Sequence, residues 1–299
     1  SYLNGEAERL MNRRREDVLG GDLWTEYPDL RHTIVEREYR RAMQDNRTVE
    51  FEFHYEALAT WFEIRAYPST EGLAVYFRDV TERKRQQQEI EFLALYDPLT
   101  QLPNRRLLLD RLRQALRNSE REGERSAVVF LDLDHFKTLN DTLGHDTGDR
   151  MLQETAGRLT RCVRASDTVA RFGGDEFAII LHDIGGDTDS ALALAERMGE
   201  KIRTALTDPY QLGEHERYTT VSIGITLLGD TGEDTADDVM KRADLAMYQA
   251  KDAGRSTLRV FAPSMRAAMA SSASSTAAAL WRTSAVLRIS SSCWGVTGL

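Results

Sequence analysis

The chain has 299 residues, of which 41% are hydrophobic and 29% charged, a balance typical of a folded protein with about two domains. Its formal net charge of −9 makes general electrostatic attraction to a nucleic-acid polymer unfavourable. Two cysteines without metal-like spacing, no apolar run of transmembrane length and no visible signal peptide lead us to expect a cytoplasmic chain without a disulfide framework or a membrane segment.

Residues 1–80 begin with short polar helical stretches and continue into segments with alternating polarity. The alternating segments are VEFEFHYE (49–56), WFEIRAYP (61–68) and GLAVYFRDV (72–80). Alternation of this kind places apolar side chains on one face of a strand and polar ones on the other. We therefore expect a half-buried antiparallel sheet preceded by helices.

Residues 81–96 contain no Gly or Pro and open with Thr81, a good capping residue, so we expect a connecting helix there. Ile90, Leu93 and Ala94 leave a narrow apolar stripe along it. Two interpretations remain open, a solvated spacer or a short parallel coiled coil between two copies, and the stripe favours the coiled coil.

From residue 97 to residue 262, helical patterns alternate with strand patterns, which predicts one α/β domain around a mixed sheet. The strand SAVVFLDLD (126–134) is almost continuously apolar, so both of its faces should be covered. Strands 168–172 and 176–181 should form a hairpin, with Gly173 and Gly174 supplying the positive φ of a two-residue turn. Further helices are expected at 103–117, within 135–143 and 149–164, and at 189–206 and 236–253, and further strands at 219–227 and 256–261.

The last stretch of the chain, residues 263–299, is rich in Ser and Ala and has no clear periodicity beyond about residue 270. We predict no fold for it. It is interpreted as a disordered tail or as non-native sequence that follows a change of reading frame.

Two acids stand where buried strands are expected to end, Asp132 in the strand 126–134 and Asp175 after the two glycines. If that strand neighbours the hairpin, the two carboxylates can converge, although burial and mutual repulsion make ionisation of both unfavourable. A divalent cation removes both problems, and a pair of carboxylates with positions left for water and phosphate suits Mg²⁺. The sequence therefore predicts a metal site that handles phosphate; solvation of two strand ends is the alternative.

Neighbouring acids and cations allow two interpretations each. Glu176 is either a site residue or a solvated acid on the opposite strand face, and Asp134 most simply caps the helix expected from residue 135. Lys137 lies in the first turn of that helix, where free N–H groups favour anions. Lys251 and Arg255 share one helix face if the helix extends so far, although Gly254 is expected to end it. Each cation also fits an ordinary surface role.

Residues 97–262 resemble the GGDEF-domain family of diguanylate cyclases. The matching motifs, in the family's order, are DPLTQLPNRR (97–106), DLDHFKTLNDTLGHDTGD (132–149), RASD (164–167), RFGGDEF (171–177), VSIGIT (221–226) and ADLAMYQAKDAGR (243–255). One short motif would be weak evidence, whereas six in order are specific. The resemblance implies that two GTP are condensed into cyclic di-GMP with release of two pyrophosphates, and that two domains of a homodimer face each other.

The resemblance also implies roles for individual residues. It assigns Mg²⁺, with Mn²⁺ as an alternative, to Asp132, Asp175 and the Leu133 carbonyl, and makes Glu176 the second acid of the signature. It implies guanine recognition by Asn140 and Asp149, phosphate contacts by Lys137, Lys251, Arg255 and main-chain N–H groups near Phe136, and product inhibition at Arg164 and Asp167. An alternative is a catalytically silent module that binds GTP or cyclic di-GMP and regulates a partner.

Residues 1–80 resemble most of a PAS sensory domain, through the stretch 2–30 and the exit signature DVTERK (79–84). The first strand of that family is missing, so we expect an incomplete domain, and the sequence identifies no ligand for it. The helix 81–96 would then carry its signal. The segment VFAPSMRAAM (260–269) resembles the start of a joint to an EAL phosphodiesterase domain, but no EAL motif follows.

Overall fold

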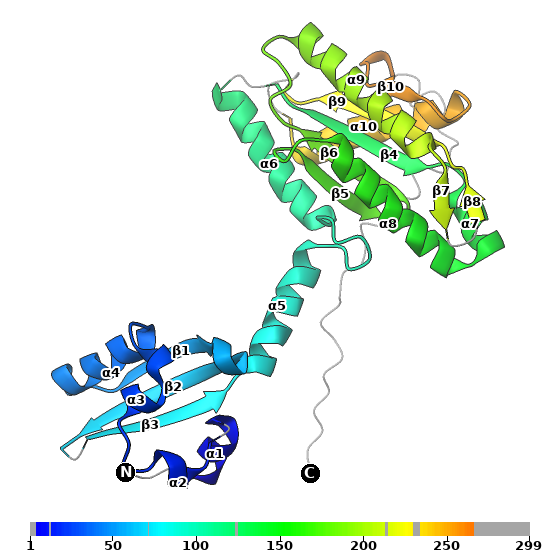
Figure 1. Ribbon diagram of the computed structural model, residues 1–299. Helices are drawn as coiled ribbons and strands as arrows, with labels where there is room; N and C mark the ends of the chain where they lie inside the picture. The colour runs from blue at the N-terminus through cyan, green and yellow to red at the C-terminus, as the bar shows by residue number, and fades with distance from the viewer. Residues whose placement is uncertain are drawn as a thin grey trace, which may run out of the picture. The chain divides into compact units, whose positions relative to one another are not determined.

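The computed structural model describes residues 4–265 except residue 12, residue 71 and the segments 123–124, 213–214 and 230–233. The chain divides into two compact units, Ser1–Ala94 and Leu95–Leu299 (Figure 1). The predicted domain borders after residues 80, 96 and 262 stay predictions. Nearly all of the predicted tail at 263–299 lies outside the described residues.

The first unit is built on an antiparallel three-stranded sheet, as its alternating segments predict. The strands are β1 (Val49–Tyr55), β2 (Thr60–Ser69) and β3 (Gly72–Asp79), in the order β1-β2-β3. The helices are α1 (Gly5–Met11), α2 (Arg15–Val18), α3 (Leu23–Glu26) and α4 (Ile34–Asp45), with 3₁₀ turns at Pro28–Leu30 and Glu56–Leu58. Helix α4 is capped by Thr33, whose hydroxyl accepts the Val35 N–H, and Val35 shares one buried core with Phe62 and Ile64 of β2.

Helix α5 (Thr81–Leu95) occupies the predicted connecting segment. None of its residues is buried, and Ile90 and Leu93 are 68% and 49% exposed. The expected capping role of Thr81 is wrong, because its hydroxyl accepts the Trp61 N–H at 2.9 Å, while the Asp79 carboxylate accepts the Thr81 N–H at 2.8 Å. The coiled-coil interpretation of this helix stays a prediction.

The second unit contains the predicted mixed sheet, in the order β10-β9-β4-β6-β5. The strands are β4 (Ala127–Leu133), β5 (Thr168–Gly173), β6 (Glu176–Leu181), β9 (Val221–Leu227) and β10 (Leu258–Val260), and a separate hairpin joins β7 (Tyr210–Leu212) to β8 (His215–Arg217). The helices are α6 (Arg105–Glu122), α7 (Phe136–Leu143), α8 (His145–Cys162), α9 (Thr188–Thr207) and α10 (Ala236–Asp252). No helix in the described ranges has the length and apolar character needed to cross a membrane.

The central strand β4 is buried along its whole length, which agrees with its continuous apolar sequence. Val129, Leu131 and Leu133 join the core formed with α8 and α9, whereas Val128 and Phe130 join the core formed with α6 and α10. Figure 1 shows these two helix pairs with the sheet. Because side chains alternate along a strand, Asp132 lies on the α6 and α10 face.

Several local boundaries differ from the expectation: α8 begins at His145 and not at residue 149, and the β7–β8 hairpin was not predicted. Two further differences have an identifiable cause. Helix α6 begins at Arg105, because the Asn104 side chain accepts the N–H groups of Arg106 and Leu107 at 3.0 and 3.1 Å. The predicted turn of two positive-φ glycines is wrong, since Gly173 pairs with Glu176 and only Gly174 has a positive φ, of 50°. The turn therefore consists of Gly174 and Asp175.

Candidate active site

An acidic cluster lies at the junction of β4 with the β5–β6 hairpin. Asp132 and Glu176 are register partners in the antiparallel pair β4–β6, so their side chains lie on the same face of the sheet. The Leu133 N–H donates to the Asp175 carbonyl at 3.4 Å, which extends this pairing to the turn. The predicted neighbourhood of the strand and the hairpin is thus confirmed.

Burial leaves these carboxyl groups poorly stabilised in their charged form. Burial raises the pKa of Asp132 to about 6, with the Asp175 charge adding to the effect and the Lys251 ammonium opposing it. Burial also raises the pKa of Asp175, and it raises the pKa of Glu176 to about 7 together with the charges of Asp132, Asp244 and Asp175. The cluster is therefore a place where added positive charge is strongly favourable.

Two expectations about the acids change. Asp175 lies in the turn, so strand alternation does not set its direction relative to Glu176. Glu176 is half-buried and lies on the same sheet face as Asp132, which favours a site residue over the solvated acid. Sequence reasoning missed Asp244 of α10. The sequence does indicate it, because Asp244 precedes Lys251 by seven residues, which places both side chains on the same helix face two turns apart.

Lys251 reaches the site from the end of α10, and the exposed Arg255 follows three residues after that helix ends. Lys251 Nζ is 2.8 Å from Asp132 Oδ2. The condition for Lys251 and Arg255 to share a helix face is not met, because α10 ends at Asp252. Gly254 ends the helix as predicted, with φ 108° and bonds from the Gly254 and Arg255 N–H groups to the Lys251 and Ala250 carbonyls.

Asp134 does not cap α7, contrary to the expectation. It is only 5% exposed, and its carboxylate accepts the Thr220 hydroxyl at 2.6 Å, the Ser222 hydroxyl at 2.7 Å and the Ser256 N–H at 3.1 Å. Arg255 and Ser256 both have positive φ, 64° and 49°, a strained conformation for residues other than glycine. Asp134 therefore ties the Arg255 turn to β9.

Helices α7 and α8 carry a second group of the predicted site residues. Phe136 is buried and Lys137 is exposed in the first turn of α7. Asn140 Oδ1 is buried without a hydrogen-bond partner among the described residues. A Cβ on Gly148 of α8 would lie 1.8 Å from this oxygen, so Gly148 permits the close approach that brings α7 next to Asp149. An unsatisfied buried amide is a group that a ligand can satisfy.

The RASD segment lies at the other end of β5 from the turn, between α8 and β5. Asp167 Oδ2 accepts the Arg164 N–H at 2.9 Å, and Oδ1 accepts the His182 N–H at 3.1 Å. The Asp167 carboxylate therefore shapes this loop, while the Arg164 side chain is exposed. The loop is separate from the acidic cluster.

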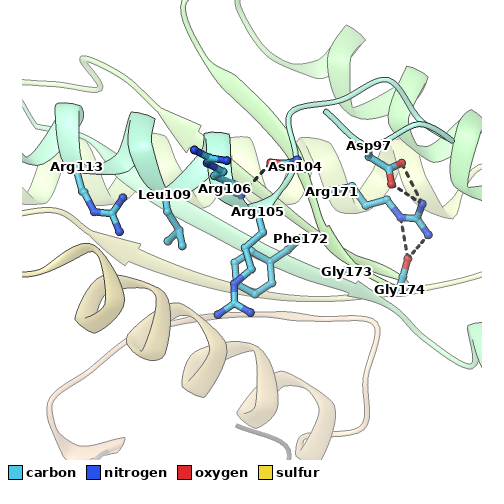
Figure 2. A pocket seen from close by; sticks show the side chains of 10 residues that line it. All are labelled: Asp97, Asn104, Arg105, Arg106, Leu109, Arg113, Arg171, Phe172, Gly173 and Gly174. Atoms are coloured by element: carbon cyan, nitrogen blue, oxygen red, sulfur yellow. Dashed lines mark hydrogen bonds and ion pairs between the residues drawn. The ribbon is translucent and has the colours of Figure 1, made fainter. Parts of the chain in front are cut away.

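Arg171 anchors the turn that carries Asp175 (Figure 2). Its guanidinium donates to both Asp97 carboxylate oxygens at 3.0 and 3.1 Å and to the Gly174 carbonyl at 3.0 and 2.8 Å. Although burial opposes the change, hydrogen bonds from Thr100 and Arg171 hold the pKa of Asp97 below its usual value. Sequence reasoning missed this clamp, although both partners stand in motifs that it had singled out.

The donor atoms fit a hard divalent cation. Asp132 and Asp175 offer carboxylate oxygens, whose raised pKa values show that the Lys251 charge does not fully offset the effect of burial. In the described ranges, no group of three or more His, Cys, Asp or Glu side chains is arranged to hold a metal ion. Two carboxylates with the Leu133 carbonyl would thus need water or phosphate oxygens to complete the coordination.

Comparison with known families agrees with the fold. Residues 94–257 match the family described as "Diguanylate cyclase, GGDEF domain", and residues 1–85 match the family described as "PAS fold". The first match covers more than half of the 299 residues. The chain belongs to the GGDEF-domain family.

Several curated relatives are much longer proteins. The "Bifunctional diguanylate cyclase/cyclic di-GMP phosphodiesterase MucR" of Pseudomonas aeruginosa is 45% identical over 187 residues, which are 62% of this chain and 26% of the relative. The "Probable diguanylate cyclase DgcE" of Escherichia coli is 31% identical over 299 residues, which are 94% of this chain and 26% of the relative. The chain thus spans about a quarter of the length of these two relatives.

Solved structures resemble the second unit's fold. A GGDEF-only form of TpbB, or YfiN, from Pseudomonas aeruginosa has a TM-score of 0.54 and 37% identity, covering 58% of this chain and 98% of that chain. The coiled coil and GGDEF domain of DgcB from Caulobacter crescentus, in complex with c-di-GMP, has a TM-score of 0.52 and 32% identity, covering 60% and 92%.

Proposed function

We propose that the chain is a Mg²⁺-dependent diguanylate cyclase, active in the cytoplasm as a homodimer, inhibited by its product and controlled by its N-terminal PAS unit. The observation that carries the proposal is the acidic cluster, in which Asp132 pairs with Glu176, lies beside the Asp175 turn and contacts Lys251 at 2.8 Å. The GGDEF-family membership and relatives named as diguanylate cyclases support the same reaction.

The proposed chemistry joins the 3′-hydroxyl of one GTP to the α-phosphorus of another, releasing pyrophosphate. Asp132, Asp175 and the Leu133 carbonyl would hold Mg²⁺ or Mn²⁺, which lowers the pKa of the attacking hydroxyl and neutralises phosphate charge. Glu176 lies on the same sheet face as Asp132, where its carboxylate would face the same bound group. The pairing of β4 with β6 thus sets the distance between the two sides of the site.

Binding of GTP is assigned to the groups around α7 and the end of α10. The first turn of α7, with the main-chain N–H groups near Phe136 and the exposed Lys137, favours phosphate. Lys251 and the Arg255 turn, held by Asp134, supply further positive charge. Asn140, whose buried Oδ1 lacks a partner in the described part of the chain, would recognise guanine together with Asp149.

Pairing of two chains follows from the reaction, because each chain supplies one nucleotide site and the product contains two nucleotides. The exposed Ile90 and Leu93 of α5 support a parallel pair of helices between two copies. The exposed Arg164 side chain, on a loop shaped by Asp167, supports product binding there. No ligand is proposed for the PAS unit.

The alternative is a module that binds nucleotide without turnover. One relative supports it, the "Cyclic di-GMP phosphodiesterase PdeR" of Escherichia coli. That protein is 37% identical over 187 residues, and its name gives only a hydrolytic activity. The intact acidic cluster favours the cyclase. Incubation of the pure chain with GTP and Mg²⁺, followed by chromatography for cyclic di-GMP, separates the two. Product from the chain but not from Asp175→Ala supports the cyclase, whereas nucleotide binding by a folded dimer without product supports the silent module.

A further inference from the structure

Lys251 lies against the acidic cluster as a cation supplied by the chain itself. It stands in the last turn of α10, and its Nζ is 2.8 Å from Asp132 Oδ2. The Asp132 side chain is only 12% exposed, so water and salt screen this ion pair weakly. A divalent cation that binds the Asp132 carboxylate must therefore compete with a partner that the fold has already placed there.

The charge of Lys251 acts on the whole cluster. Burial is the largest cause of the raised pKa values of Asp132, Asp175 and Glu176, and the Lys251 ammonium opposes it at all three carboxyl groups. The cluster is thus partly neutralised by one ammonium. Because two cations beside the same carboxylate repel each other, a divalent cation loses affinity for as long as this ammonium stays in place.

The backbone around Lys251 is held, so the freedom to move lies in its side chain. The Lys251 carbonyl accepts the Gly254 N–H at 3.3 Å, and the Asp134 carboxylate accepts the Ser256 N–H at 3.1 Å. The Lys251 side chain is nevertheless 27% exposed. A lysine ammonium on its flexible four-carbon stem can exchange one partner for another by rotation about side-chain bonds alone.

We propose that Lys251 is an exchangeable counter-cation of the acidic cluster, which pairs with Asp132 until a divalent cation binds there and then passes to the phosphate groups of the nucleotide. The inference rests on the proposed function, which places Asp132 on the metal and Lys251 among the groups that bind GTP. Phosphate offers the displaced ammonium a new partner, whereas a divalent cation alone leaves it without one. Metal and nucleotide should therefore strengthen each other's binding, which makes the metal–nucleotide complex the favoured ligand.

The test measures metal binding without turnover. Mn²⁺ is titrated into the full chain and followed by electron paramagnetic resonance, first alone and then with α,β-methylene GTP. Lys251→Met removes the ammonium and keeps a side chain of similar shape, and Lys241→Met is the matched control. Lys241 is an exposed lysine of the same helix, 3.8 Å from Asp238, so both substitutions change the net charge equally.

Mn²⁺ alone should bind about tenfold or more tightly to Lys251→Met than to the unsubstituted chain, because the competing ammonium is gone, and with unchanged affinity to Lys241→Met. The increase in Mn²⁺ affinity that α,β-methylene GTP causes in the unsubstituted chain should shrink in Lys251→Met. Thermal unfolding with Mg²⁺ alone is a second readout, and its upward shift should be larger in Lys251→Met.

A measurement on the unsubstituted chain follows the ammonium directly and does not depend on the folding of a variant. Reductive methylation of the Lys251 amine, read by peptide mass spectrometry, should become faster when saturating Mg²⁺ is added alone, because the amine loses Asp132. It should become slower again when α,β-methylene GTP is added, because the amine gains phosphate. Methylation of Lys241 should change in neither case.

Unchanged or weaker Mn²⁺ binding by folded Lys251→Met, or methylation of Lys251 that does not respond to Mg²⁺, would overturn the exchange. Equal strengthening by Lys241→Met would also overturn it, because general charge would then be the cause. In these cases the proposed function still stands if Mn²⁺ binds and is lost in Asp132→Asn. A chain that binds no Mn²⁺ in any form contradicts the proposed function itself, and this inference with it.

Discussion

Asp132 and Glu176 face each other across the antiparallel pair β4–β6, and burial raises the pKa of both, to about 6 and about 7. The fold thus holds two acids together in surroundings that disfavour their charge. The nearest compensating group is Lys251, at 2.8 Å from Asp132. An arrangement of this kind gains stability from a cation, which connects the strand register directly to the proposed metal-dependent chemistry.

Removal of one acid should separate function from stability. Asp132→Asn is expected to lower cyclic di-GMP formation by about a hundredfold or more, because it removes a proposed metal ligand. Thermal unfolding of the unsubstituted chain should shift upward with Mg²⁺ and GTP, and that of the variant should not. An equal shift in both proteins would contradict the assignment. Asp237→Asn, in the first turn of α10, is a control.

Loss of the Asp134 carboxylate should loosen the Arg255 turn. Asp134→Ala leaves the Thr220 and Ser222 hydroxyls and the Ser256 N–H without their acceptor, so we expect about 1–3 kcal/mol lower unfolding free energy. The KM for GTP should rise in Asp134→Asn, which keeps the volume and part of the hydrogen bonding, with a smaller effect on kcat. Urea unfolding measures the unfolding free energy, and initial rates measure the KM for GTP. A normal KM would show that Asp134 does not position Arg255.

The Asp97–Arg171 clamp predicts a pH dependence of stability. The pKa of Asp97 is lowered in the fold, so its contribution is present above its unfolded value of about 4 and is lost as pH falls through the lowered folded value. Asp97→Asn should therefore be less stable at pH 6, and the difference should shrink towards pH 3. Urea unfolding at both values measures it; a difference that does not change with pH would mean that charge is not the cause.

Two glycines should differ in how much alanine destabilises the fold. Gly148→Ala should destabilise the fold and weaken GTP binding, because its Cβ would lie 1.8 Å from Asn140 Oδ1. Gly173→Ala meets open space at an ordinary φ, so its unfolding free energy should change by less than about 0.5 kcal/mol. Thermal unfolding with nucleotide titration compares them, and equal destabilisation by the two substitutions would contradict the difference in packing.

Much of the site framework could be predicted from the sequence, because strand burial and turns leave local patterns. The continuous apolar run of β4 and the glycines of the hairpin were sufficient to place Asp132 near the end of a buried strand and Asp175 beside a hairpin turn, and Gly254 was sufficient to end α10. The start of α6 depends on hydrogen bonds to the Asn104 side chain, and the end of β5 depends on a bulge. The local sequence pattern specifies neither of them.

The contacts that complete the site could not be predicted, because they join residues far apart in sequence. Asp134 was expected to cap the next helix, as its position before α7 suggests, but residues of β9 and Ser256 offer it more donors. The Asp97–Arg171 pair spans 74 positions and needs the folded sheet to form. Asp244 joins the acidic cluster only because α10 packs against β4 and β9.

The central claim, that Asp132 and Asp175 share one nucleotide-bound divalent cation, is tested most directly by electron paramagnetic resonance of Mn²⁺ titrated into the chain with α,β-methylene GTP. The account predicts about one tightly bound Mn²⁺ per nucleotide site, lost in both Asp132→Asn and Asp175→Asn although the variants remain folded. Undiminished Mn²⁺ binding in either folded variant would contradict it.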